Sequence, residues 1–407
     1  SDRTHEHEAK RNANGHDELP WQANEEDLWG WTMIDRTKRQ DIPLYRFITE
    51  YAERNAANEY RPVAVGRYGI RTRESIYSKE LATDYSKNKL IFKNTLTVGM
   101  GSVQIDIGIL TDEVTYSVSP AYHTYRISGI NPKYLDYCLK YRNQDMFSRY
   151  AKRGSRQGKS IDLKRWIEYE IPVYDLIVQD EVVERLEAVQ RIIEYREQQL
   201  TFLEGLIKAR FVEMFGDPIH PIHSCKLSEI ALLERGRFSP RPRNDPKYYN
   251  GEYPFIQTGD IASANHRLLD YKQTLNELGI KVSKKFDAGT IVMAIVGATI
   301  GATAILEREV YAPDSVIGIM PYKYNTVFLE TLLQFWQPEL LRIAPESARA
   351  NINLSILGDV PIVKIDTDVQ NKFADFVAQV DKSKVAVQKA LDEAQTLYDS
   401  LMQEYFG

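Results

Sequence analysis

Residues 178–216 read VQDEVVERLEAVQRIIEYREQQLTFLEGLIKARFVEMFG, and residues 369–407 read VQNKFADFVAQVDKSKVAVQKALDEAQTLYDSLMQEYFG. The two stretches align without a gap at an offset of 191 positions, and the alignment extends upstream to residues 160 and 351. The identical pairs include Ile161 and Ile352, Leu163 and Leu354, Ile171 and Ile362, Asp175 and Asp366, Leu206 and Leu397, and Glu213 and Glu404. An internal repeat of this kind indicates a tandem duplication.

Both stretches carry apolar residues at alternating steps of four and three, as along the seam of a coiled coil. These residues are Val182, Leu186, Val189, Ile193, Leu200, Leu203, Ile207 and Met214 in the first copy, and Phe373, Val377, Val380, Val387, Leu391, Ala394, Tyr398, Leu401 and Tyr405 in the second. Arg196, Arg210 and Lys384 are charged exceptions on the seam. We predict two long helices that pack antiparallel on each other. The alternative is two separate helices, each covering its own domain.

Each predicted helix follows a block of short strand-like runs separated by turn residues. Residues 101–110 (GSVQIDIGIL) of the first block line up with residues 297–306 (GATIGATAIL) of the second. The expected organisation is an N-terminal extension (1–40), a first domain (41–177), a first spacer helix (178–216), a second domain (217–363) and a second spacer helix (364–407). The fold class is therefore α+β, with two mixed α/β domains joined and separated by two long antiparallel coiled-coil helices.

Composition places the chain among ordinary globular proteins, with 43% hydrophobic and 27% charged residues. Its two cysteines, Cys138 and Cys225, cannot form a disulfide framework and fit a reducing cytosol. Residues 289–306 (GTIVMAIVGATIGATAIL) are uncharged over a length that could cross a bilayer. Their glycines and β-branched residues favour a buried strand, a tight turn and a second buried strand instead.

The net charge of −5 is spread unevenly along the chain. Residues 41–177 carry 21 basic and 16 acidic side chains, net +5, whereas residues 1–40 and each predicted helix are net −3. Residues 140–165 alone have nine basic against two acidic side chains, and residues 235–247 have five against one. Such basic runs can neutralise DNA phosphates and read base edges, although a solvated surface loop is the alternative for each.

The residues that we expect to contact DNA come from these two runs, from a smaller basic and aromatic segment near Tyr68, and from residues 347–353, which repeat part of the first run. They are Arg67, Arg71, Arg73, Arg149, Lys152, Arg153, Arg156, Gln157, Lys159, Arg235, Arg237, Arg241, Arg243, Lys247 and Arg349.

No catalytic, cofactor-binding or metal-binding constellation emerges from the sequence. Residues 153–160 (RGSRQGKS) lack the first glycine of a phosphate-binding loop, because Arg153 stands there. Residues 244–248 (NDPKY) only partly match the Asp-Pro-Pro-Tyr motif of amino-methyltransferases, and Pro313-Asp314 lacks the rest of a nuclease motif. His220, His223 and Cys225 lack a fourth metal ligand.

The ordered set of motifs resembles the specificity subunits of type I restriction-modification enzymes. Residues 226–230 (KLSEI), 235–237 (RGR), 253–256 (YPFI) and 258–261 (TGDI) follow the family's pattern for the second block. Both junctions between block and helix also fit, since a hydrophobic-Pro pair leads to Gln179 and to Gln370. The resemblance covers about residues 41–407. Residues 1–40, with Trp21, Trp29 and Trp31, have no counterpart in it.

The resemblance implies a non-catalytic DNA-sequence reader in which each block is a target-recognition domain for half of a split, asymmetric site. The helices would set the gap between half-sites and dock two methyltransferase subunits, and two restriction subunits could join them. S-adenosylmethionine, ATP and magnesium would bind to those partners, in a prokaryotic cytoplasm. The competing hypotheses are a stand-alone DNA methyltransferase or nuclease with unrecognised motifs, and a coiled-coil interaction scaffold.

Overall fold

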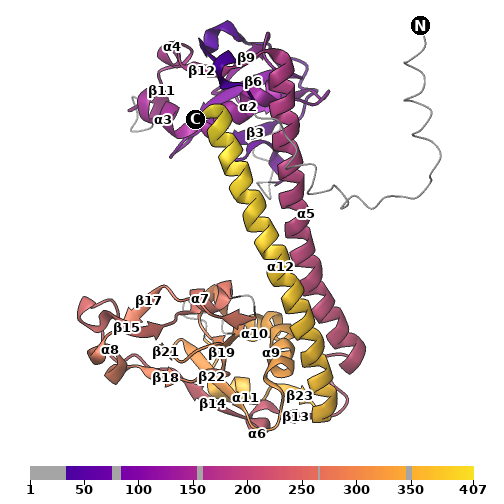
Figure 1. Cartoon of the computed structure of the whole chain (residues 1–407), viewed down its shortest axis with the longest axis vertical. Helices are drawn as coiled ribbons and strands as arrows, with labels where there is room; N and C mark the ends of the chain where they lie inside the picture. Colours follow the sequence, from indigo (N-terminus) through magenta and orange to yellow (C-terminus); the bar gives the residue numbers. More distant parts are fainter. Residues whose placement is uncertain (1–33, 76–83, 154–158, 265, 345–350) are drawn as a thin grey trace, which may run out of the picture. The chain divides into compact units, whose positions relative to one another are not determined.

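The computed structural model describes residues 34–75, 84–153, 159–264, 266–344 and 351–407. They form two compact units (Figure 1). The first unit contains the described residues up to Glu197 together with Ala390–Gly407, and the second contains Gln198–Lys389. Most of the expected N-terminal extension lies outside the described residues. Each long helix contributes residues to both units, since α5 spans Leu176–Phe215 and α12 spans Thr367–Phe406.

The first unit is built on an antiparallel sheet in the order β2-β9-β6-β7. Helices α2 and α3 contact β7, and β1 pairs with β12 where the chain enters α5. Its strands are β1 (Gln40–Pro43), β2 (Ile48–Tyr51), β3 (Val63–Gly66), β4 (Gly69–Thr72), β5 (Lys89–Ile91), β6 (Thr95–Met100), β7 (Ile105–Leu110), β8 (Tyr116–Val118), β9 (His123–Ile127), β10 (Ala151–Arg153), β11 (Lys159–Ile161) and β12 (Glu170–Val173). Its helices besides α5 are α2 (Pro132–Tyr141), α3 (Asn143–Tyr150), α4 (Leu163–Trp166) and the 3₁₀ turns η1 (Arg36–Lys38), η2 (Leu44–Arg46) and η3 (Arg73–Ser75).

The second unit contains two sheets, in the orders β14-β22-β19-β20-β16 and β17-β15-β21-β18. Its strands are β13 (Ser224–Lys226), β14 (Ala231–Arg235), β15 (Tyr249–Phe255), β16 (Arg267–Leu268), β17 (Gln273–Leu275), β18 (Lys284–Phe286), β19 (Ile291–Ala294), β20 (Thr303–Leu306), β21 (Val310–Ala312), β22 (Val316–Pro321) and β23 (Pro361–Val363). Its helices besides α12 are α6 (Leu227–Ile230), α7 (Thr258–Ser263), α8 (Glu277–Val282), α9 (Thr326–Phe335), α10 (Gln337–Ile343), α11 (Leu354–Gly358), η4 (Pro246–Tyr248) and η5 (Gly297–Thr299).

The duplication read from the sequence extends to the strand order. The antiparallel succession β2-β9-β6-β7 of the first unit recurs in the second as β14-β22-β19-β20. The pairing of β1 with β12 recurs as β13 with β23, and a helix pair follows β9 and β22 alike. The second sheet of the second unit has no such counterpart among the described residues of the first, so the halves differ there mainly in what is added to a shared frame.

A buried glutamine fastens each long helix to its unit in the same way. Gln179, which is 1% exposed, accepts a hydrogen bond from the backbone N–H of Asn131 (2.8 Å) and donates one to the carbonyl of Tyr174 (2.7 Å). The second unit repeats both bonds at the duplicated positions, from Asn325 N to Gln370 Oε1 (2.8 Å) and from Gln370 Nε2 to Ile365 O (2.8 Å). These bonds explain why the Val-Gln pair appears in both copies.

Replacing Gln179 by alanine is expected to lower the free energy of unfolding by about 2–4 kcal/mol, because two backbone groups then lose their partner. Urea denaturation of the full chain measures this loss. The matched control is Gln395→Ala on α12, an exposed glutamine whose amide bonds only Asp399 and whose loss is expected to cost less than about 0.5 kcal/mol. Equal losses in both variants would contradict this role for Gln179.

The predicted antiparallel pairing of the long helices is confirmed, and it is seen in each unit (Figure 1). In the first unit, the start of α5 packs on the end of α12, where Gln190 Nε2 donates to the Tyr398 hydroxyl at 3.2 Å. In the second, the end of α5 packs on the start of α12, and the rings of Phe211 and Phe373 lie 5.3 Å apart. The charged seam position Lys384 is 6% exposed and lies 3.6 Å from Glu204.

The uncharged stretch 289–306 forms the strand, turn and strand that its glycines predict. The strands β19 and β20 are buried at every position and pair antiparallel around η5. Gly297 and Gly301 adopt φ values of +65° and +81°, which a side chain would strain. Within the part of the chain that the structure describes, no helix has the length and apolar character needed to cross a membrane.

Candidate nucleic-acid interface

The hairpin formed by β3 and β4 presents a compact group of basic and aromatic side chains in the first unit. Gly66 pairs with Gly69, so Arg67 and Tyr68 form the two-residue turn between the strands. The Tyr68 ring is 68% exposed, and the Arg67 and Arg71 guanidinium carbons lie 5.7 and 5.1 Å from its centre. This cation–π arrangement leaves an exposed aromatic ring and two cations together at a hairpin tip.

Arg73, at the end of the same hairpin, has a different environment. Its guanidinium carbon lies 5.4 Å from the centre of the Tyr85 ring, and its Nε is buried without a hydrogen-bond partner among the described residues. Buried donors normally have a hydrogen-bond partner, so the Arg73 Nε–H is available to an acceptor on a bound ligand.

Two predicted cations of the long basic run of the first unit are ion-paired within the protein. Arg149 contacts Asp145 at 2.8 Å, and Lys152 contacts Asp162 at 3.3 Å. Burial acts to raise the pKa of Asp145, but hydrogen bonds from Tyr169 and Arg149 outweigh it and hold that pKa below its usual value. The hydrogen bond from Lys152 likewise lowers the pKa of Asp162. Both carboxylates are therefore ionised at neutral pH and partly offset the positive charge.

The strands β10 and β11 contain two more of the predicted residues of this run. Arg153 ends β10 and Lys159 begins β11, with their backbones paired to each other. Arg156 and Gln157, which stand between these strands in the sequence, lie outside the described residues, as does Arg349.

Three predicted arginines of the second unit converge on one acidic residue, Asp314. The Arg235 side chain donates to the Asp314 backbone carbonyl at 2.6 Å. Arg241 binds the Asp314 carboxylate at 3.2 Å, and Arg243 binds its other oxygen. Because one carboxylate is shared by several guanidinium groups, the cluster keeps a net positive charge. We refer to Arg235, Arg241, Arg243 and Asp314 as the arginine cluster.

The other two predicted cations of this unit are held separately. Arg237 donates to the Ser283 carbonyl at 3.3 Å, which ties β14 to the start of β18. Lys247 pairs with Asp245 at 2.9 Å, and this bond lowers the pKa of Asp245 and raises that of Lys247.

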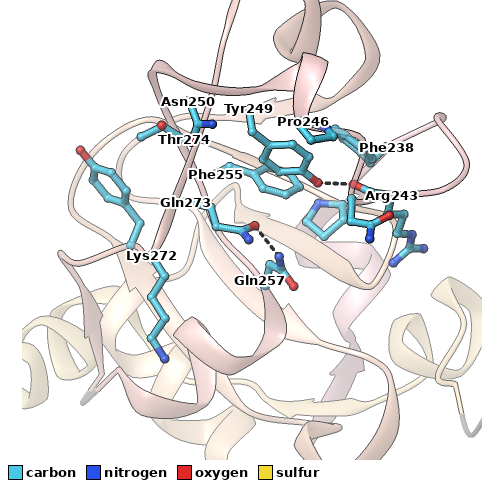
Figure 2. Close-up of a pocket in the computed structure, with 13 residues that line it drawn as sticks. Phe238, Arg243, Pro246, Tyr249, Asn250, Phe255, Gln257, Lys272, Gln273 and Thr274 are labelled. Carbon is cyan, nitrogen blue, oxygen red and sulfur yellow. Dashed lines mark hydrogen bonds between the residues drawn. The ribbon is translucent and has the colours of Figure 1, made fainter.

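A surface cavity of about 550 Å³ lies beside the arginine cluster (Figure 2). Its lining includes the cations Arg243 and Lys272 and the four carboxamides Asn244, Asn250, Gln257 and Gln273, but no carboxylate. Two smaller cavities in the first unit, of about 250 and 270 Å³, are lined by carboxylates, including Asp136 and Asp106. The cavity of the second unit is thus better suited to a polyanion than either of these.

Sequence reasoning missed Asp314, Lys272 and the glutamines of the cavity. Asp314 stands about seventy residues from the arginines that it holds, so no local charge count reveals it. Gln257 and Gln273 belong to no basic run. The one available signal was the TGDI motif at 258–261, whose Asp260 accepts a hydrogen bond from the backbone N–H of Gln257 at 2.7 Å.

Replacing Asp314 by asparagine is expected to strengthen binding to random-sequence duplex DNA by roughly threefold to tenfold and to steepen its salt dependence, because the arginines lose their internal counter-charge. Titrations over a range of KCl concentrations measure both effects. The control is Asp287→Asn, which removes a carboxylate that pairs with Lys285, outside the arginine cluster. An unchanged or weaker salt dependence in the Asp314 variant would contradict this account of the cluster.

No group of three or more histidine, cysteine, aspartate or glutamate side chains could hold a metal within the described ranges. This finding covers the loose cluster of His220, His223 and Cys225, whose side chains lie in described positions.

Comparison with known proteins links this architecture to one family. Residues 222–394 match the family model of the type I restriction modification DNA specificity domain. The chain's fold is similar to that of the S subunit of a type I restriction-modification system from M. genitalium, with a TM-score of 0.54 and 15% identity over 93% of this chain and 98% of that one. It is also similar to a chain from a study of complex assembly and conformational transition of the type I R-M system, with a TM-score of 0.55 and 16% identity over 92% and 98%. No curated protein matches the chain in sequence.

The segment that matches the family model contains the arginine cluster, the cavity and most of α12. The frame of that segment recurs in the first unit, and the fold agrees with the compared structures over nearly the whole chain. Residues 222–394 thus match the type I restriction modification DNA specificity domain, and the fold of the chain is similar to that of the compared S subunit.

Proposed function

We propose that each unit of this specificity subunit reads one half of a bipartite, asymmetric site in double-stranded DNA. The observation that carries the proposal is the duplicated frame with unlike exposed surfaces. One unit presents the Arg67–Tyr68–Arg71 hairpin tip, and the other presents the arginine cluster and the cavity. A shared frame gives both units the same approach to DNA, while different surfaces select different bases.

The exposed cations of both units supply phosphate contacts and release counterions. Arg241 and Arg243 keep side-chain exposures of 55% and 45% in spite of their bonds to Asp314. Arg149 and Lys152 are similarly exposed, at 59% and 56%, but each is paired with a carboxylate of its own, whereas Arg241 and Arg243 share one. The arginine cluster therefore keeps more uncompensated positive charge, so we assign the larger contributions to the hairpin tip and the arginine cluster.

We also propose that the chain is a type I specificity subunit, with DNA and the other subunits of a restriction-modification complex as its partners. We further propose that two methyltransferase subunits dock on the long helices and that two restriction subunits can join them. S-adenosylmethionine, ATP and magnesium then belong to those partners, and the complex works in the prokaryotic cytoplasm. The present chain serves as the recognition component, without catalysis of its own.

Docking on the helices is expected to use their exposed apolar side chains. Phe202 and Val385 are each 71% exposed, although they lie on helices whose other faces pair in the second unit. The Phe202→Ala/Val385→Ala variant is expected to weaken association with the methyltransferase subunit by at least tenfold, because large exposed apolar groups dominate such contacts. Co-purification and light scattering measure this loss.

DNA binding by the docking variant is the internal control. Its direct binding to duplex DNA is expected to stay within about twofold of the parent chain, because neither residue belongs to a basic surface. Unchanged association with the methyltransferase subunit would contradict the docking proposal.

Sequence-specific footprinting of the complex tests the function itself. The full chain, purified with its methyltransferase partner, is expected to protect two short segments with an unprotected gap between them. Its affinity is expected to fall steeply with salt. Protection of one short contiguous segment would overturn the bipartite proposal. If a variant with reversed charges at Arg153 and Arg156 kept its full activity, the result would instead favour an interaction scaffold that does not bind DNA through these residues.

A further inference from the structure

The cavity of the second unit contains two glutamine side chains that are joined to each other. Gln257 Nε2 donates a hydrogen bond to Gln273 Oε1 at 2.6 Å, and both residues are exposed (Figure 2). A carboxamide has two donor hydrogens and two acceptor lone pairs. One mutual bond leaves each glutamine with further donor and acceptor capacity, and both residues line the cavity.

The backbone around this pair is fixed before any ligand arrives. The buried Asp260 carboxylate accepts the backbone N–H of Gln257 at 2.7 Å, at the start of α7. Gln273 begins β17, where it pairs with Phe255 of β15, and Asn276 Nδ2 donates to the carbonyls of Lys247 (2.9 Å) and Tyr249 (3.1 Å). Ordering that is already present in the free protein reduces the entropy lost on binding. The pair is therefore a preorganised hydrogen-bonding group.

The chemistry of the lining selects the kind of ligand. Arg243 and Lys272 flank the carboxamides, so an anionic backbone can lie beside groups that read a polar edge. Phe238 and Phe255 are only 1% and 2% exposed, which leaves their faces unable to stack on an extruded base. The two tyrosine rings of the lining are also engaged, since Tyr249 packs on both phenylalanines and the Arg308 guanidinium carbon lies 5.7 Å from the centre of the Tyr271 ring. The cavity thus favours the edge of a base that stays in the duplex over a base flipped out of it.

Among base edges in the major groove, adenine offers one acceptor, N7, next to one donor, N6. A carboxamide that presents one donor and one acceptor matches this edge with two hydrogen bonds. We propose that the Gln257–Gln273 pair reads one adenine in the half-site bound by the second unit, an inference that rests on the proposed function. Lys272 contributes a sequence-independent phosphate contact beside it.

Selection from long duplexes of random sequence tests this inference. The full chain, purified with its methyltransferase partner, is compared with its Gln257→Ala and Gln273→Ala variants. Each variant is expected to select the parent motif with one adenine position made degenerate in one half-site, while the other half-site stays unchanged. Affinity for the parent site is expected to fall by between about fivefold and 100-fold, the cost of one bidentate base contact.

Two controls separate base reading from general weakening. The Lys272→Ala variant changes the same cavity and is expected to keep the parent motif while binding all duplexes more weakly. Replacing the assigned adenine by 7-deazaadenine, which lacks the N7 acceptor, is expected to weaken binding of the parent chain but not of the Gln257 variant.

The outcomes distinguish this inference from the function on which it rests. If the parent chain selects no split motif, the proposed function fails. If it selects one and both glutamine variants select the same motif with no new degeneracy, only the present inference fails. The inference is also overturned if the position that becomes degenerate is a G·C pair. It is overturned as well if the Gln273→Ala variant loses selection of both half-sites.

Discussion

The Arg241→Ala/Arg243→Ala variant is expected to bind duplex DNA on the order of 100-fold more weakly than the parent chain. Each guanidinium that contacts a phosphate releases about 0.9 counterions, so the slope of log affinity against log salt should become shallower by about 2. Both side chains are already held at Asp314 and remain about half exposed, so little reorganisation is needed for them to reach the phosphates. Affinity titrations at several KCl concentrations measure both quantities.

The matched control removes two exposed cations elsewhere in the same unit. Lys323 is exposed and follows the end of β22. Arg342 lies on α10 with 71% of its side chain exposed. The Lys323→Ala/Arg342→Ala variant has the same net charge as the test variant and is expected to retain affinity within about threefold. Equal losses in the two variants would mean that total charge, and not the arginine cluster, governs binding.

The Phe211→Ala variant is expected to lose about 3–5 kcal/mol of the free energy of unfolding, the range for deleting a buried aromatic ring. Phe211 is fully buried, and its ring lies 5.3 Å from those of Phe328 and Phe373. The substitution therefore opens a cavity where α5, α9 and α12 meet. Urea denaturation of the full chain measures the loss.

The control for this core position is Phe202→Ala, nine residues earlier on α5 and 71% exposed. It removes the same side chain from the same helix and is expected to change stability by less than about 0.5 kcal/mol. If Phe211→Ala were no more destabilising than Phe202→Ala, the packing of the two helices in the second unit would not hold that unit together.

Periodic patterns predicted the parts of this fold that depend on local sequence. The heptad positions Leu186 and Val189 are fully buried, as are Ile207 and Phe373, because a long apolar seam has few ways to be buried other than against another seam. The strand, turn and strand of residues 289–306 followed from glycine positions, since only glycine adopts positive φ without strain.

The candidate site could be predicted only in part, because its geometry depends on contacts between distant residues. The basic runs located Arg241 and Arg243, but their partner Asp314 comes from the loop between β21 and β22. Local charge counts also gave Arg149 and Lys152 the same weight as Arg67, although both are ion-paired with nearby carboxylates. The Gln257–Gln273 pair joins α7 to β17 and carries no charge, so the search for basic residues passed over it.

Methylome sequencing of cells with and without this chain tests the central claim that two unlike units read two half-sites. The account predicts that one methylated motif disappears with the chain, and that this motif has two dissimilar specific parts separated by a fixed run of unspecified bases. It also predicts that the Arg67→Ala/Arg71→Ala variant weakens methylation without changing the part read by the second unit. Loss of a single contiguous motif, or no change in methylation when the methyltransferase subunit is present, would contradict it.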